Sequence, residues 1–172
     1  MIVLITGKSA SGKTTLMNLL QYVFDNAGII KSVTTRKPQL EDSSEYECLS
    51  YEEFKSSINN REFVSWRKGS KDELRKDDYY GVRFSDVNRS LLENELSIRS
   101  VTPSNVQDWN RYYGEKTVFI HLLAPTEAET RRRILTRGGL NESEIIERIR
   151  LERHWDEGVI ALKESGIPIY LI

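Results

Sequence analysis

The residues of this chain with the clearest chemical meaning form one glycine-rich octet near its start. Residues 7–14 read Gly-Lys-Ser-Ala-Ser-Gly-Lys-Thr, which fits the pattern G-x-x-x-x-G-K-S/T. In this pattern backbone N–H groups surround phosphates, the lysine reaches the outer phosphates and the threonine hydroxyl binds Mg²⁺. Lys13 is therefore a candidate catalytic cation and Thr14 a candidate metal ligand. The predicted phosphate-binding residues are Gly7, Ser9, Ala10, Ser11, Gly12, Lys13, Thr14 and Thr15. The motif predicts binding of a nucleoside triphosphate, with ATP as the implied ligand.

The segments on either side of the octet are those that such a site needs. The apolar run Ile2–Ile5 predicts a buried strand before it, and Leu16, Leu19 and Leu20 begin a helical spacing behind it. A strand, a glycine turn and a helix N-terminus together point amides and the positive end of a helix dipole at an anion. These flanking segments argue against the alternative, a glycine-rich loop that binds nothing.

A group of arginines in the last third of the chain could serve phosphoryl transfer. Its members surround the glycine pair 138–139 and are Arg131, Arg132, Arg133, Arg137 and Arg148. Positioned arginines stabilise the charge that spreads over a transferred phosphoryl group, and are worth about 10³ or more in rate. The same cluster could equally be a solvated helix face.

Two further observations concern what receives the phosphate. Thr34-Thr35-Arg36 follows a predicted strand, at the mouth of the expected cleft. The base-reading pattern N-K-x-D of GTPases does not occur, and the D-x-x-G at residues 25–28 ends a predicted helix. The chain is therefore not expected to be a switch GTPase.

Strands and helices alternate along most of the chain. Strands are predicted at residues 2–5, 29–33, 62–66, 79–84, 96–101, 117–123 and 167–172, with a charged loop at 67–78. Helices are predicted behind the octet, after Ser50, from Pro103 through Trp109, after Thr126, and from Asn141 toward Lys163. This alternation predicts an α/β fold with a parallel sheet covered by helices on both faces. Residues 34–83 interrupt it and indicate an inserted small domain.

Length and composition limit the kind of protein this can be. The 172 residues suffice for one domain with a proper core, and the net charge of −1 gives no attraction toward nucleic acid or an anionic membrane. The single cysteine, Cys48, cannot form an internal disulfide and fits a reducing compartment. No run approaches the roughly 18 apolar residues of a membrane span. We expect a cytoplasmic protein without nucleic-acid or membrane partners.

Beyond these patterns, the chain resembles the guanylate kinase family over nearly its whole length. The matching segments are residues 7–16, Ser32-Val33-Thr34-Thr35-Arg36-Lys37-Pro38, Glu45-Tyr46, residues 49–54, Glu62-Phe63-x-x-Trp66, Tyr79-Tyr80-Gly81, and Arg133-x-x-x-Arg137-Gly138 followed by Arg148. The Thr-Thr-Arg-x-Pro and Tyr-Tyr-Gly pieces are specific in this order.

The resemblance implies a P-loop nucleoside monophosphate kinase with an Arg-rich lid. It implies an ATP-binding core at residues 1–32 and 84–172, an acceptor-binding subdomain at 33–83 and a lid at 126–146. The residues that would grip the acceptor phosphate are Ser32, Arg36, Tyr46 and Tyr80. The residues that would bridge donor and acceptor phosphates as the lid closes are Arg133, Arg137 and Arg148. The two tyrosines could instead simply pack between short strands.

Several positions depart from that family's pattern. Two carboxylates look responsible for reading guanine; one position is Ser65 here, and the other falls at Arg99 or Ser100. The acidic residue expected near the magnesium ion is Val101, and a second phosphate-gripping arginine is Gln39. A guanine site needs hydrogen-bond acceptors, so strict GMP specificity is not expected. A cation at Arg99 favours a second anionic group or the carbonyl edge of a pyrimidine.

Three hypotheses therefore remain open. The leading one is an ATP- and Mg²⁺-dependent kinase acting on a small phosphorylated acceptor, a nucleoside or deoxynucleoside monophosphate, with GMP as the family default. The second is a ribose 1,5-bisphosphate phosphokinase forming phosphoribosyl pyrophosphate, because Phe63-Val64-Ser65-Trp66 and Arg99-Ser100 resemble that family's segments. The third is a non-catalytic guanylate-kinase-like binding domain. Such domains usually have eroded phosphate loops, whereas this loop is whole.

Overall fold

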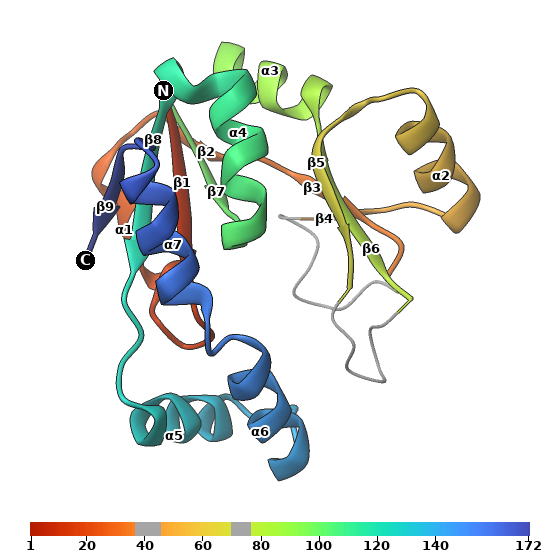
Figure 1. Cartoon of the computed structure of the whole chain (residues 1–172). Coiled ribbons are helices and arrows are strands. Elements are labelled where there is room, and N and C mark those ends of the chain that lie inside the picture. Colours follow the sequence, from red (N-terminus) through yellow and green to blue (C-terminus); the bar gives the residue numbers. More distant parts are fainter. Residues whose placement is uncertain (37–45, 70–76) are drawn as a thin grey trace.

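The computed structural model describes residues 1–36, 46–69 and 77–172, and its centre is a five-stranded parallel sheet (Figure 1). The strands follow the order β2-β7-β1-β8-β9. Their bounds are β1 Ile2–Gly7, β2 Ala27–Ile29, β7 Leu96–Ser100, β8 Thr117–Leu122 and β9 Ile169–Leu171. Every neighbouring pair in this sheet is parallel. The predicted α/β class is confirmed.

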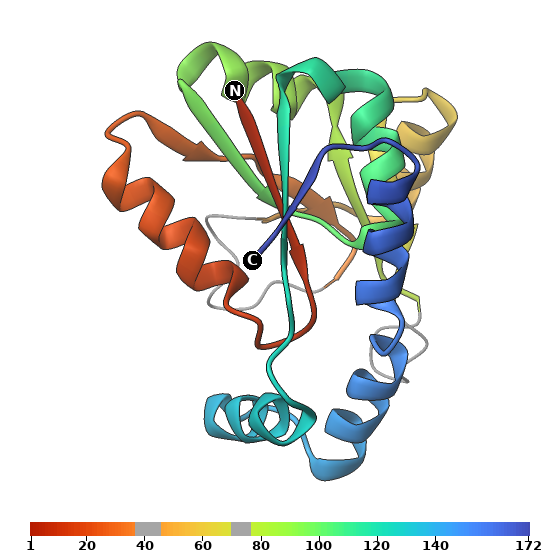
Figure 2. The same ribbon diagram turned by 60° about the vertical axis from the view of Figure 1, so that its left-hand side comes forward.

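Helices cover both faces of this sheet, as the alternation predicts. Figure 2 shows α1 (Lys13–Val23) on one face, and α4 (Val106–Tyr113) and α7 (Trp155–Glu164) on the other. The central strand β1 is buried along its whole length. Its side chains alternate between the two faces: Val3 packs in the cluster of Met17, and Leu4 in the cluster of Trp109. This double coverage explains why β1 reads as a continuous apolar run.

A second sheet lies beside the parallel one, in the order β4-β3-β6-β5. Its strands are β3 Ser32–Thr34, β4 Tyr46–Cys48, β5 Phe63–Lys68 and β6 Tyr79–Arg83. β3 pairs with β4 in parallel and with β6 antiparallel, and β5 pairs with β6 antiparallel. Helix α2 (Tyr51–Asn59) begins at a capping box of Ser50 and Glu53, as predicted.

The predicted single strand at residues 29–33 is wrong, because the chain changes sheets within it. β2 belongs to the parallel sheet and β3 to the second sheet, with two residues, Ile30 and Lys31, between them. The Ile30 N–H still donates to Ile98 O of the parallel sheet, at 2.9 Å. The chain therefore leaves the first sheet directly after Ile30.

The predicted long helix from Asn141 toward Lys163 is two helices, α6 (Glu142–Leu151) and α7. Between them the backbone makes short-range turn contacts, Arg153 N–H to Arg150 O at 3.3 Å and Trp155 N–H to Glu152 O at 3.1 Å. These three-residue closures replace the four-residue closures of an α-helix and change the axis direction. Glu152 lies at this break.

Other elements differ from the sequence prediction or complete it. Helix α3 (Phe84–Glu93) was not predicted, and its buried face includes the polar residues Asp86 and Ser90, which hides the apolar periodicity. β5 continues through Lys68, into the segment expected to be a loop; residues 70–76 of that segment lie outside the described residues. α5 spans Glu127–Arg137, and 3₁₀ turns span Pro103–Asn105 and Gly114–Lys116.

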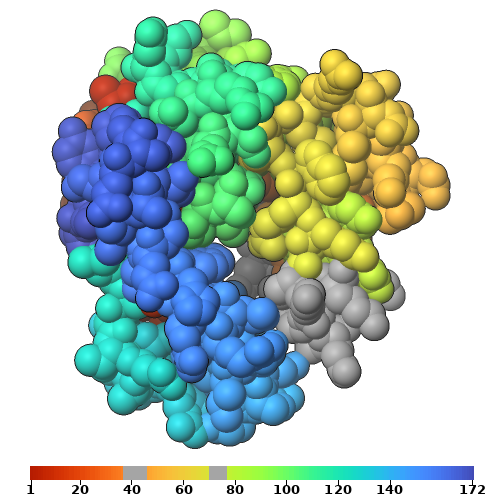
Figure 3. Space-filling model, viewed as in Figure 1, coloured from red at the N-terminus to blue at the C-terminus, as the bar shows by residue number. Residues whose placement is uncertain are grey.

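The helices α5 and α6 extend beyond the carboxyl end of β8 (Figure 1). In the space-filling view α6 and β5 stand on opposite sides of a hollow (Figure 3). Among the described residues, no helix combines the length and apolar character needed to cross a membrane.

Candidate active site

The glycine-rich loop turns the chain from β1 into α1 through backbone angles that favour glycine. Gly7 has a φ of 151°, and a Cβ there would lie 2.6 Å from Ser11 Oγ and 2.7 Å from the Leu122 carbonyl oxygen. Gly12 has a φ of 101° and is the N-cap of α1. Both glycines are therefore required by geometry. Lys13 and Thr14 follow as the first residues of the helix.

The Lys13 side chain folds back across this loop. Its Nζ donates to the carbonyl oxygens of Gly7, at 2.7 Å, and Lys8, at 2.8 Å. Burial lowers the pKa of Lys13 to about 8; nearby Glu152 acts in the opposite direction, and the charges of Arg148 and Arg137 lower it further. A buried ammonium surrounded by other cations is poised to gain from an anionic ligand.

Two of the arginines predicted to belong to a lid contact the loop directly. Arg133 Nη1 donates to the Ala10 carbonyl oxygen at 3.1 Å, and Arg148 Nε donates to Ser9 Oγ at 2.6 Å. Arg137 lies close enough to affect the Lys13 pKa. Arg133 from α5 and Arg148 from α6 therefore meet at the loop, whereas Arg137 is exposed at the end of α5.

The rest of the arginine cluster lies on the surface. Arg131 pairs with Glu142, and Arg132 donates to both carboxylate oxygens of Glu129 at 2.7 Å. Arg131 and Arg132 are exposed. These two residues therefore belong to a solvent-exposed helix face, the alternative given for the arginine cluster.

Two glutamates contribute to the site that sequence reasoning did not identify. Glu129 also accepts from Arg133 Nε at 2.7 Å; hydrogen bonds from Arg132 and Arg133 lower the pKa of Glu129 to about 2. Its only sequence signal was its place three residues after the helix cap Thr126. Glu152 accepts from the Ser9 N–H at 2.5 Å and from Ser9 Oγ at 2.7 Å. It carried no signal, because it falls inside the expected long helix.

A polar cluster behind the loop connects it to α7 and β8. Lys8 Nζ lies 2.6 Å from Asp156 Oδ2, and His121 Nε2 lies 2.9 Å from Asp156 Oδ1. Burial raises the pKa of Asp156, but the hydrogen bonds from Lys8 and His121 outweigh it, so the pKa lies below its ordinary value. His121 is fully buried, consistent with a structural role.

The predicted acceptor residues gather around β3 in the second sheet. Ser32 is opposite Tyr46 in the ladder, and Thr34 is opposite Tyr80. The two tyrosine rings meet edge to face, with centroids 6.4 Å apart, and the Arg36 guanidinium lies 5.6 Å from the Tyr46 centroid. Ser32 is buried. Arg67, which was not predicted, lies over the Tyr80 ring at 4.9 Å.

Arg99 reaches this group from the parallel sheet. It extends from β7, is only 5% exposed, and its guanidinium lies 5.3 Å from the Tyr46 centroid. Its Nη1 donates to the Ile30 carbonyl oxygen at 3.1 Å, whereas its Nε has no hydrogen-bond partner among the described residues. Arg99 therefore joins the two sheets and brings a buried cation to the tyrosines.

Ser65 is buried on β5 and accepts a hydrogen bond from Asn105 Nδ2 at 3.3 Å. Neither position at which guanine reading was expected holds a carboxylate, and Val101 is buried. The remaining predicted segments, Lys37, Pro38, Gln39 and Glu45, lie outside the described residues.

Thr14 is the residue that fits a magnesium ion. Its side chain is exposed at the amino end of α1. The described part of the chain contains no group of three or more His, Cys, Asp or Glu that could hold a metal. Mg²⁺ typically keeps waters and takes few protein ligands beside substrate phosphates, so one hydroxyl at this helix end is compatible with it.

Comparisons with known proteins point in one direction. A family model described as "Guanylate kinase" matches residues 1–155. The guanylate kinase of Porphyromonas gingivalis is 34% identical over 140 residues, covering 80% of this chain and 72% of the relative. That of Bacteroides thetaiotaomicron is 31% identical over 148 residues, covering 85% and 70%. The crystal structure of guanylate kinase from Anaplasma phagocytophilum shares the fold, with a TM-score of 0.59 at 19% identity, covering 98% and 96% of the two chains.

Proposed function

The chain belongs to the guanylate kinase family, and on this basis we propose that it transfers the γ-phosphoryl group of ATP to a nucleoside or deoxynucleoside monophosphate. The observation that carries the proposal is the convergence of Lys13, Arg133 and Arg148 on one phosphate loop. These cations come from three separate helices, α1, α5 and α6. Such convergence fits a polyphosphate ligand.

At the donor end, the chain would bind the phosphates with loop amides and Lys13. Lys13 exchanges its contacts with the Gly7 and Lys8 carbonyls for phosphate oxygens, which are stronger partners for an ammonium group. Thr14 would hold magnesium, which supplies positive charge to the phosphates when bound. No nucleophilic side chain is required, because in-line transfer depends on positioning and charge stabilisation.

The lid, which we assign to residues 126–146 as in the family, would bring further positive charge over the γ-phosphate. Arg133 and Arg137 lie on α5, and Arg148 lies on α6 just beyond that segment. Closure of such a lid excludes water from the transferred group.

At the acceptor end, we assign residues 33–83 to the binding of the monophosphate, and 1–32 with 84–172 to the ATP-binding core. Tyr46 and Tyr80 lie on β4 and β6, on either side of β3, and Arg36, two residues after the end of β3, lies over the Tyr46 ring. A guanidinium and two hydroxyls can hold a phosphate dianion in a fixed orientation. Ser32 supports them from the same strand as Thr34.

The residues near the expected base site bear on which base the acceptor nucleotide carries. Guanine presents N–H donors at its Watson–Crick edge, and such donors need acceptor groups in the protein. Arg99 offers only donors, and Ser65 is engaged by Asn105. We therefore propose that GMP is not strictly preferred, and that acceptors with a carbonyl edge, such as UMP or dTMP, are used as well.

A second candidate is ribose 1,5-bisphosphate, and one observation favours it. The buried Arg99 Nε lacks a partner among the described residues, so a second phosphate group on the acceptor would satisfy it. The relatives reported above are named guanylate kinases and lend this candidate no support.

The test is ADP release from ATP and MgCl₂ with each acceptor in turn: GMP, dGMP, UMP, dTMP, CMP, AMP and ribose 1,5-bisphosphate. Turnover of at least one nucleoside monophosphate is the expected result. Turnover of the bisphosphate alone would replace the proposal with the second candidate. Failure of every acceptor would instead support a non-catalytic binding domain, to be checked with phosphopeptide ligands.

A further inference from the structure

A carboxylate of the chain itself is bonded to the phosphate loop. Glu152 Oε2 accepts from the Ser9 N–H at 2.5 Å, and Oε1 accepts from Ser9 Oγ at 2.7 Å. Its side chain is 12% exposed. Both oxygens of one anion are thus held by one loop residue, through a backbone amide and a hydroxyl.

The surroundings of this carboxylate are those expected for a bound anion. Its charge raises the pKa of Lys13, against the stronger effect of burial. Arg148 Nε lies 3.8 Å from Glu152 Oε1 and bonds to the same Ser9 hydroxyl at 2.6 Å. Loop amides, a lysine and an arginine are also the groups that bind phosphate oxygens. Glu152 therefore accepts hydrogen bonds from groups that a donor phosphate would also use.

We propose that Glu152 is an internal anion that competes with the donor phosphates for the loop, and that its release also frees Arg148. This inference rests on the proposed function, since it requires ATP to be the ligand of the loop. Glu152 is a positioning residue in this scheme, because it acts through Ser9 and Arg148.

The position of Glu152 couples its release to the lid. Glu152 is the C-cap of α6, one helical turn after Arg148, at the break between α6 and α7. α6 also packs on the loop, because Ile145 shares a small apolar cluster with Ala10 and with Ile134 of α5. A movement of the end of α6 therefore carries Glu152 and Arg148 together.

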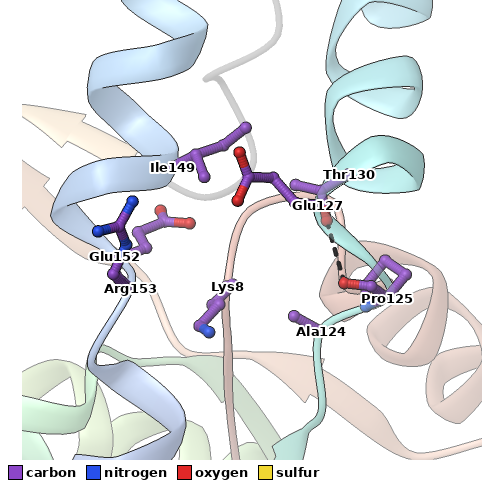
Figure 4. Close-up of a pocket in the computed structure, with 8 residues that line it drawn as sticks. All are labelled: Lys8, Ala124, Pro125, Glu127, Thr130, Ile149, Glu152 and Arg153. Carbon is purple, nitrogen blue, oxygen red and sulfur yellow. Dashed lines mark hydrogen bonds between the residues drawn. The ribbon is translucent and has the colours of Figure 1, made fainter.

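A pocket beside the loop gives the released side chain somewhere to go. It lies between the loop, α5 and the end of α6, with Glu152 on the side of α6 and Pro125 and Thr130 on the opposite side (Figure 4). Lys8 and Arg153 also line it. Arg153 would pair with a carboxylate that has left Ser9, whereas Lys8 is already paired with Asp156 at 2.6 Å and the charge of Glu127, which also lines the pocket, would oppose this movement.

The proposal is tested by ATP binding to Glu152→Gln and Glu152→Ala. When only a fraction of the molecules has the loop free of its internal competitor, the observed affinity for the ligand is reduced to that fraction of the intrinsic affinity. Removing the competing charge should therefore tighten ATP binding by roughly tenfold. Calorimetry with ATP and MgCl₂, without acceptor, measures this. The matched control is Glu147→Ala, on the same helix, whose carboxylate bonds to Arg150 at 2.7 Å; its affinity should equal that of the wild type.

Kinetic and thermal measurements separate competition from a merely structural role. The KM for ATP should fall in Glu152→Gln, while the KM for the acceptor stays constant. The unliganded variants should melt at a lower temperature than the wild type, and ATP should raise their melting temperature by a larger amount. A purely structural Glu152 would weaken ATP binding when removed.

The outcomes are distinguishable. Unchanged or weaker ATP binding in Glu152→Gln would overturn the role of Glu152 while leaving the proposed function intact. Absence of any heat with the wild type would overturn the proposed function, and this inference with it. The Gln variant keeps the size of the side chain, so it carries the test if the Ala variant does not fold.

Discussion

At the scale of single residues, the ligand preference of the loop depends on the positive charge of Lys13 and on the neutral carbonyl groups that it contacts. Its ammonium is bonded to two backbone carbonyls and depressed in pKa. Neutral carbonyls are weak substitutes for phosphate oxygens. Lys13 therefore gains when phosphate oxygens replace these carbonyls, which favours a polyphosphate ligand.

Replacing Lys13 with Ala should lower the rate of phosphoryl transfer at least about 10³-fold, because it removes a positioned cation from the transferred group. ADP release with the best acceptor measures this loss. Lys116→Ala, an exposed lysine in the second 3₁₀ turn, is the control and should retain the wild-type rate. A Lys13→Ala variant of near-normal rate would contradict the mechanism.

ATP affinity should depend on pH through Lys13. With its pKa lowered to about 8 by burial, the free protein carries the charged lysine below that value and loses it above. Since the charged form binds phosphate, affinity should be nearly constant from pH 7 to 7.5 and then weaken, by up to about tenfold per pH unit. Calorimetric titrations at pH 7, 8 and 9 measure this; equal affinities at all three would contradict it.

The spacing of residues predicted the turn of the loop, but it was the family resemblance, and not the spacing, that singled out Arg133, Arg137 and Arg148 from the arginine cluster. Gly7, Gly12 and Lys13 have positions fixed by backbone geometry, so their spacing is informative. Arg132 and Arg133 are neighbours in the chain, yet one remains on the surface and the other reaches Ala10. Which side of α5 faces the loop depends on how α5 packs against α6, and this long-range packing is not visible in spacing.

At the scale of elements, α6 is the part of the molecule whose stability matters most to the loop. It begins with a capping box, in which Glu144 N–H donates to Asn141 Oδ1 at 3.0 Å and Asn141 N–H donates to Glu144 at 2.7 Å. It ends with Arg148 and Glu152 at the loop. Its amino end therefore stabilises a helix whose carboxyl end contacts Ser9 of the loop.

Asn141→Ala should destabilise α6 by about 1 kcal/mol, the usual cost of losing an N-cap. Amides of residues 145–149 should exchange about fivefold faster with solvent, and turnover should fall because Arg148 is less well held. Hydrogen exchange read by mass spectrometry measures the first effect. Ser50→Ala removes the equivalent cap from α2 and should speed exchange in α2 alone. Unchanged exchange in α6 would contradict this prediction.

Element boundaries were the part of the fold that the sequence predicted least well. Apolar runs and caps located β1, β8, α2 and the start of α6. The break after α6 was missed, because residues 152–154 are compatible with a helix and the tertiary contact of Glu152 with Ser9 lies at the break. The change of sheet after Ile30 was also missed, since both strands are only three residues long and two residues separate them.

At the scale of the whole molecule, α6 and β5 stand on opposite sides of the hollow in which transfer would occur (Figure 3). The loop follows β1 of the parallel sheet, whereas the tyrosines proposed to bind the acceptor belong to the second sheet, and Ile30 and Lys31 join the two sheets. Transfer needs reacting groups about 3–3.5 Å apart, so some closure of these parts is expected.

Closure should be measurable by small-angle X-ray scattering. A compact 172-residue chain has a radius of gyration of about 16 Å. The unliganded protein should exceed this value, and an analogue that joins adenosine to a nucleoside through a chain of phosphates should bring it toward about 16 Å. Lys13→Ala is the control and should not contract. An identical radius with and without the analogue would contradict closure.

The buried arginine of β7 has a consequence for anyone who wishes to redirect this protein to another substrate. Arg99 lies beside Tyr46, which is proposed to bind the acceptor, and it also donates a hydrogen bond to the Ile30 carbonyl oxygen, where the chain crosses between the sheets. Any replacement of Arg99 that is chosen to change substrate selectivity will also remove this hydrogen bond to Ile30. Engineering should therefore begin at Ser65, whose bond to Asn105 can be rearranged while the crossing stays intact.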